Sequence, residues 1–152
     1  MNKQTLLRVC IFLALVGVGL SAYSFLHNRS FIEGTFCNLN STFSCDVVNK
    51  GPYSTMLGVP VALVGIIGYG FLLVGSILKL RQPDDRSLTV FLALASGGAV
   101  VFSLYLTSLE AFVLHVWCII CLLSQFSILM IFTIIVWMLH QERASLSAPK
   151  AL

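Results

Sequence analysis

The stretch VWCIICLLSQFSILMIFTIIVWML, residues 116–139, decides the fold class of this 152-residue chain. It is long and apolar enough to form a helix across the roughly 30 Å hydrocarbon core of a bilayer. It also begins with a Cys-x-x-Cys pair, Cys118 and Cys121. A dithiol at the point where a membrane helix meets water can exchange electrons with a soluble protein and with a lipid-soluble carrier. The stretch therefore indicates a membrane protein with redox chemistry.

The composition of the whole chain supports a membrane protein. Hydrophobic residues make up 58% of the sequence and charged residues only 10%, whereas soluble domains carry about 25% charged residues. The net charge of +3 is small, and the basic residues form no dense block. The composition thus excludes an ordinary soluble domain and does not indicate nucleic-acid binding.

Three more apolar runs are long enough to cross a bilayer. We predict an all-α bundle of four membrane helices at residues 6–26, 59–80, 88–109 and 112–139. The connections differ in length, because residues 27–58 form a long polar loop and residues 81–86 a short charged turn around Pro83. One membrane domain is expected over residues 1–140, followed by a polar tail over residues 141–152.

The basic residues predict how the helices are oriented in the membrane. In the four-span arrangement only Arg29 and Lys50 lie on the side of the long loop. The opposite side carries Lys3, Arg8, Lys79, Arg81, Arg86, Arg143 and Lys150. The positive-inside rule places this richer side, with both termini, in the cytoplasm and the loop outside. A cleaved signal peptide over the first run is an alternative that would leave the sidedness of the remaining chain unchanged.

The predicted topology separates the five cysteines into two groups. Cys37 and Cys45 in the loop share the outer, oxidising side with Cys118 and Cys121. Cys10 lies in the inner half of the first span, tens of ångströms away at about 1.5 Å per helical residue. We expect Cys10 to fill space in the apolar core, as buried free cysteines commonly do.

The outer cysteines admit more than one interpretation. Cys118 and Cys121, three residues apart, share one face of a helix whose N-terminus favours the reactive thiolate. His115, one turn earlier, is either a helper of these thiols or an interfacial polar residue. Cys37 and Cys45 form either a structural disulfide or a mobile shuttle pair, and a zinc site made by the four outer cysteines is a third possibility.

Polar side chains inside the expected spans are candidates for binding a redox carrier. Gln125 lies one turn after Cys121, and Tyr105 lies in the third span. We predict that both contact a quinone near Cys121, although hydrogen bonding between helices would also explain them. Tyr69 and Ser124 have the same two interpretations.

Several motifs occur in one order along the chain. Cys37 and Cys45 are separated by seven residues, and residues 53–65, YSTMLGVPVALVG, lead into the second span. Residues 103–106, SLYL, and residues 117–121, WCIIC, follow. In this order and spacing the chain resembles the vitamin K epoxide reductase family in its prokaryotic, quinone-dependent form.

The resemblance implies a fold and an electron path. The outer loop would carry a short half-helix over a four-helix bundle that holds ubiquinone or menaquinone near Cys121. Cys121 would pass electrons to the quinone, Cys118 would be its resolving partner and pair with Cys45, and Cys37 would exchange with a thioredoxin-like protein. Because the chain ends at Leu152 without such a domain, that partner is expected to be a separate extracytoplasmic protein. The reaction would support disulfide formation in proteins exported across a prokaryotic cytoplasmic membrane.

The sequence departs from the family at some positions. Lys50 and Gly51 stand where many members have a serine pair, and Gln125 stands where the vertebrate enzymes have a tyrosine. These differences argue against vitamin K epoxide as the substrate. Two alternatives remain: a true epoxide reductase of the same fold, and a non-enzymatic membrane scaffold with structural disulfides.

Overall fold

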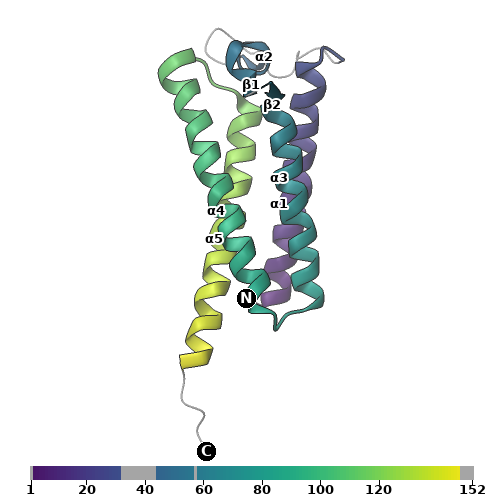
Figure 1. Cartoon of the computed structure of the whole chain (residues 1–152), viewed down its shortest axis with the longest axis vertical. Coiled ribbons are helices and arrows are strands. Elements are labelled where there is room, and N and C mark those ends of the chain that lie inside the picture. The colour runs from purple at the N-terminus through teal and green to yellow at the C-terminus, as the bar shows by residue number, and fades with distance from the viewer. Residues whose placement is uncertain (1, 32–43, 57, 148–152) are drawn as a thin grey trace, which may run out of the picture.

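Four long helices form an elongated bundle (Figure 1). The computed structural model describes residues 2–31, 44–56 and 58–147, with side chains to Ala144. The helices are α1 (Lys3–Asn28), α3 (Val61–Arg81), α4 (Arg86–Leu109) and α5 (Ile119–Ser147). Within the described residues these four are long and apolar enough to cross a membrane. The predicted all-α, four-helix membrane fold is confirmed.

The short elements gather at one end of the bundle, where they form what we call the cap, residues 45–56 and 58–60 (Figure 1). The cap contains α2 (Cys45–Lys50), a 3-10 turn (Pro52–Ser54) and the antiparallel pair β1 (Thr55–Met56) and β2 (Val59–Pro60). Helix α2 agrees with the half-helix expected in the long loop. The turn between α3 and α4 and the N-terminus lie at the opposite end (Figure 1).

The core of the bundle is built from apolar side chains of all four long helices. Leu72 of α3, Leu92 of α4 and Ile131 of α5 are at most 2% exposed and belong to one cluster. Helix α1 contributes Cys10, which is fully buried in the same cluster, as expected for a space-filling cysteine. Gly17 of α1 faces the Tyr69 ring so closely that a Cβ there would collide with it. This glycine therefore allows the close contact between α1 and α3.

A buried ion pair stabilises the end of the bundle opposite the cap. Lys79 is 1% exposed, and its Nζ lies 2.9 Å from Oε1 of Glu142. The same ammonium group donates to the carbonyl oxygens of Pro83 (2.8 Å) and Asp85 (3.0 Å). Because each proton of the ammonium group has an acceptor, this buried charge is compensated, and it ties α3, the turn and α5 together.

The predicted bounds of the fourth span, residues 112–139, were wrong, whereas α4 ends at Leu109, as predicted for the third span. After Leu109 the third membrane helix continues as a π-helical turn, Glu110–Leu114, so residues 112–114 do not begin the fourth span. His115 then adopts a left-handed conformation with φ of 52°, which ends the helix, and α5 begins only at Ile119. Helix α5 continues to Ser147, beyond residue 139, where the apolar run ended and a polar tail was expected.

Candidate redox site

Two cysteines from distant parts of the chain meet beneath the cap. Sγ of Cys45, the first residue of α2, lies 3.3 Å from Sγ of Cys118, just before α5, and both residues are 0% exposed. The backbone N–H of Ser44 donates to the Trp117 carbonyl oxygen (3.2 Å), which aligns the two segments. The sulfur atoms are therefore in contact without being bonded, at a distance that suits thiol–disulfide exchange.

The cysteines of the Cys-x-x-Cys pair are free thiols, whereas Cys45 is disulfide-bonded. Cys37 lies outside the described residues. Within the described part of the chain, no three His, Cys, Asp or Glu side chains gather in a metal-binding arrangement.

Cys118 caps the N-terminus of α5 with its sulfur atom. The Cys121 backbone N–H donates to Cys118 Sγ (3.4 Å), and the Leu122 N–H donates to the Cys118 carbonyl oxygen (3.0 Å). The first N–H groups of a helix have no partner within the helix, so a side-chain acceptor here satisfies one of them.

A buried carboxyl group, which the sequence reasoning did not identify as part of the site, completes the surroundings of the cysteine pair. Glu110 is 3% exposed and opens the π-helical turn after α4. Its Oε2 accepts a hydrogen bond from the Cys118 N–H (3.1 Å), and the carboxyl group also interacts with the Cys121 thiol. The sequence could have indicated Glu110, because it is an acidic residue between two long apolar runs, and ionisable residues at membrane depth commonly have a function.

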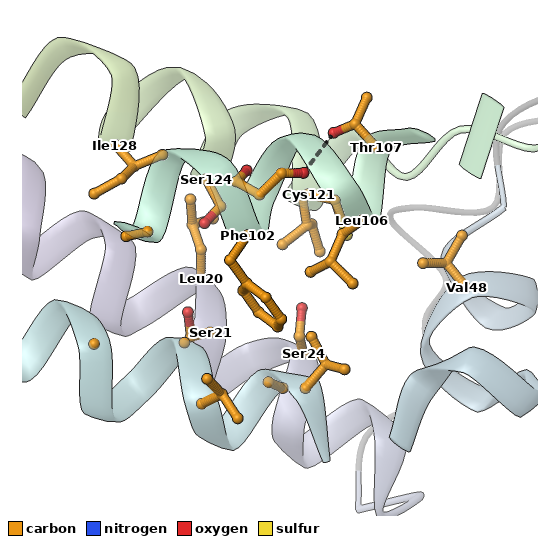
Figure 2. Close-up of a pocket in the computed structure, with 18 of the residues that line it drawn as sticks. Leu20, Ser21, Ser24, Val48, Phe102, Leu106, Thr107, Cys121, Ser124 and Ile128 are labelled. Carbon is orange, nitrogen blue, oxygen red and sulfur yellow. Dashed lines mark hydrogen bonds between the residues drawn. The ribbon is translucent and has the colours of Figure 1, made fainter. Parts of the chain in front are cut away.

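Below the cysteines lies a cavity of about 410 Å³. Its walls come from α1, α3, α4 and α5, and Figure 2 shows side chains from these helices around one space, with Val48 of α2 at one end. Cys121 lines this cavity, whereas Cys118 and Cys45 are not among its lining residues. The volume is in the range of small-molecule sites, about 300–1,000 Å³, and the walls are mostly apolar.

Polar groups are spaced along the cavity wall. Ser21 and Ser24 of α1, Thr107 of α4 and Ser124 of α5 line it (Figure 2). Tyr69 of α3 lines it as well. The Tyr69 hydroxyl donates to the Ser124 carbonyl oxygen (2.6 Å) and lies 3.0 Å from Ser124 Oγ. A few placed polar groups in an apolar pocket are typical of a site that orients a largely apolar ligand.

The two predicted quinone contacts lie elsewhere. Gln125 and Tyr105 are both described by the structure, and neither of them lines the cavity. Gln125 Oε1 accepts a hydrogen bond from Thr107 Oγ1, which is the helix–helix contact considered as its alternative role. Tyr105 is 49% exposed on the outside of the bundle. His115 is exposed as well, with Nδ1 3.0 Å from the Ala111 carbonyl oxygen.

Polar contacts hold the cap on α1. The fully buried His27 of α1 places Nε2 3.0 Å from Asp46 Oδ1 of α2. Lys50 Nζ lies 3.1 Å from the same oxygen, one turn along α2. Asn28 donates through Nδ2 to the Asn49 carbonyl oxygen. These contacts position α2, and therefore Cys45, relative to the bundle.

The comparisons with known proteins agree with this geometry. The sequence matches the model of the Vitamin K epoxide reductase family over residues 8–136, which include all or most of each of the four membrane helices and the cysteines of the site. No match among curated proteins was found. A match over most of the chain, together with the four-helix membrane fold, establishes that the chain belongs to the vitamin K epoxide reductase family of membrane oxidoreductases.

Proposed function

We propose that the protein is a quinone-dependent thiol:disulfide oxidoreductase. Electrons enter from a reduced thioredoxin-like protein at Cys37, pass to Cys45, then to Cys118 and Cys121, and leave to a quinone in the cavity. The observation that carries the proposal is the order of the sulfur atoms. Cys118 touches Cys45 beneath the cap, at 3.3 Å, while Cys121, one turn further, lines the apolar cavity.

The exchange step uses the contact between Cys45 and Cys118. When the partner's thiolate attacks Cys37, a partner–Cys37 mixed disulfide forms and Cys45 is released as a thiolate. The Cys45 thiolate then attacks Cys118, so that a Cys45–Cys118 bond forms, the Cys118–Cys121 bond breaks, and Cys121 leaves as a thiolate. Reacting atoms held about 3–3.5 Å apart need little further movement, which favours this step. The partner's second thiol forms a disulfide with the first and releases Cys37. The Cys37 thiolate then attacks Cys45, which re-forms the Cys37–Cys45 disulfide and releases Cys118 as a thiolate.

The pair then delivers electrons to the quinone. The arrangement with Cys45 in a disulfide and with free thiols at Cys118 and Cys121 corresponds to the state before this transfer. Two thiols lose two electrons and two protons and form a disulfide, and the quinone becomes a quinol. Tyr69, Ser124 and the α1 serines are among the polar residues on the cavity wall that would face the ring oxygens. The surrounding apolar side chains suit a lipid-soluble molecule and exclude water.

The basic residues support a topology in which the cap faces outward. Arg81 and Arg86 flank the turn at the opposite end of the bundle, and Lys3 and Arg8 begin the N-terminal helix there. The cap carries only Lys50, which is held by Asp46. Under the positive-inside rule, the proposed site is on the extracytoplasmic side of a prokaryotic membrane, where a separate thioredoxin-like protein would be oxidised.

Quinone reduction by the purified, detergent-solubilised protein tests the proposal. The assay supplies a reduced thioredoxin-like protein and soluble ubiquinone and menaquinone analogues. Cys121→Ala should abolish turnover, while the matched variant Cys10→Ala, which removes a buried cysteine remote from the site, should keep it. Absence of turnover in a folded wild-type protein, or turnover of vitamin K epoxide in place of the quinones, would contradict the proposal.

A further inference from the structure

Glu110 is a buried ionisable group next to the cysteine pair, and the electron path described above does not use it. Its Oε2 accepts a hydrogen bond from the Cys118 N–H at 3.1 Å, and Glu110 lines the cavity together with Cys121. One carboxyl group is therefore held at the Cys-x-x-Cys pair and at the space that would hold the electron acceptor. A general base must lie close to both the group that loses a proton and the reacting molecule, and Glu110 occupies such a position.

The local backbone holds this carboxyl group in place. The N–H groups of His115 and Val116 both donate to the Glu110 carbonyl oxygen, the second at 3.3 Å, and so close the chain reversal between α4 and α5. Glu110 thus begins the turn and points its side chain back toward the start of α5. A hydrogen bond to the Cys118 N–H requires only an acceptor, which a glutamine would also supply. On the cavity wall that Glu110 shares with Cys121, a carboxylate can also accept a proton, which an amide cannot do.

We propose that Glu110 is the proton acceptor for the Cys121 thiol during electron transfer to the quinone; this inference rests on the function proposed above. In this step the S–H bond of Cys121 breaks and the proton goes to the Glu110 carboxylate. Across the whole reaction the thiols of Cys118 and Cys121 lose two electrons and two protons and form one S–S bond. The quinone takes up both electrons and both protons as it becomes a quinol, and Glu110 returns to the carboxylate.

Few other groups compete for this role. Within the described residues, Cys121 is the titratable side chain that interacts with the Glu110 carboxyl group. Cys121 in turn interacts with Cys118. Asp46 and Lys50 of the cap are paired with each other, and Asp46 also with His27 of α1. The His115 ring lies against the Ala111 carbonyl oxygen.

The test compares single-turnover quinone reduction by fully reduced wild type and Glu110→Gln across a range of pH. Glutamine keeps the acceptor for the Cys118 N–H but cannot take a proton. Wild type should lose rate toward acid, where Glu110 becomes protonated. The Gln variant should be slower by about 10²-fold, the usual scale of general base catalysis, and should lack this acid limb. Glu110→Asp, which keeps a carboxylate, should retain the limb.

Two controls separate proton transfer from positioning. Glu142→Gln makes the same change at a second buried glutamate, at the opposite end of the bundle, and should keep the acid limb. The rate of exchange between Cys45 and Cys118, measured by peptide mass spectrometry, should change by no more than about twofold in Glu110→Gln. The glutamine side chain still accepts the hydrogen bond from the Cys118 N–H.

Each unfavourable outcome has a distinct meaning. An active wild type with an unchanged pH profile in Glu110→Gln overturns the role of Glu110 alone. Loss of the Cys45–Cys118 exchange in that variant overturns it too, in favour of a structural role. A wild type that reduces none of the quinones overturns the proposed function, and the role of Glu110 with it.

Discussion

The sulfur atoms of Cys45 and Cys118 lie 3.3 Å apart although 73 residues separate them in the chain. The contact joins the first turn of α2 to the residue that caps α5. Both residues are fully buried, so the cap shields the contact from water. A thiol and a disulfide at this distance can exchange with little backbone movement.

The contact predicts which cysteines cross-link. In a Cys37→Ala, Cys121→Ala variant, mild oxidation should join Cys45 to Cys118 in most molecules, because their sulfur atoms already touch. Non-reducing peptide mass spectrometry measures the bridge. The matched variant Cys37→Ala, Cys118→Ala leaves Cys45 with Cys121 and should bridge more slowly. Equal rates in the two variants would contradict the geometry.

The cavity predicts the effect of filling it from α4. Gly98 lines the cavity, and a Cβ at this position would meet no atom within 4 Å. Gly98→Leu should therefore fold and occupy cavity space, raising the KM for quinone about tenfold, which corresponds to roughly 1.4 kcal/mol of lost binding. Steady-state kinetics with a soluble quinone measures this change.

Gly70 of α3 provides the matched control for the cavity. A Cβ there also meets no atom within 4 Å, but Gly70 does not line the cavity. Both changes replace a helical glycine and gain about 1 kcal/mol of helix propensity, so stability should change alike. If Gly70→Leu raised the KM as much as Gly98→Leu, the cavity would not be the quinone site.

The Tyr69 hydroxyl predicts a stability effect next to the site. Tyr69→Phe removes its bonds to the Ser124 carbonyl oxygen and hydroxyl group and should destabilise the bundle by about 1 kcal/mol, the usual net value of a hydrogen bond. Ser124→Ala keeps the shorter bond, to the carbonyl oxygen, and should have a smaller effect. Thermal unfolding of the two variants in the same detergent compares them. A larger loss in Ser124→Ala would reverse this ranking.

The cap contacts predict that Asp46 matters more than Lys50. Asp46→Asn weakens the link from α2 to the buried His27, so it should slow exchange between Cys45 and Cys118 severalfold. Lys50→Gln removes only a half-exposed partner, whose ion pair contributes about 0–1 kcal/mol, and should leave the rate nearly unchanged. Rapid quenching with an alkylating reagent follows the exchange. Equal effects of the two changes would show that the link to α1 does not position Cys45.

Local properties of the chain were sufficient to predict the fold class. The length and apolar character of each run predict a membrane helix without knowledge of its neighbours, because a bilayer imposes a minimum length of about 20 residues. The cysteine spacing and the position of the pair at the start of the last helix are local as well. The predictions that were wrong concern boundaries: the π-helical turn and His115 moved the last helix start from residue 112 to Ile119.

Tertiary structure decided which side chains reach the site. Gln125 and Ser124 are neighbours on α5, yet Ser124 lines the cavity and Gln125 bonds to Thr107, because the packing of α5 against its neighbours sets its rotation about its own axis. Glu110 reaches Cys118 only because the chain reverses between α4 and α5. By itself, the sequence determined the four spans and the position of the Cys-x-x-Cys pair at the start of the last one. The rotation of each helix and the fold of the turns, which follow from contacts between distant segments, decided how these residues form one site.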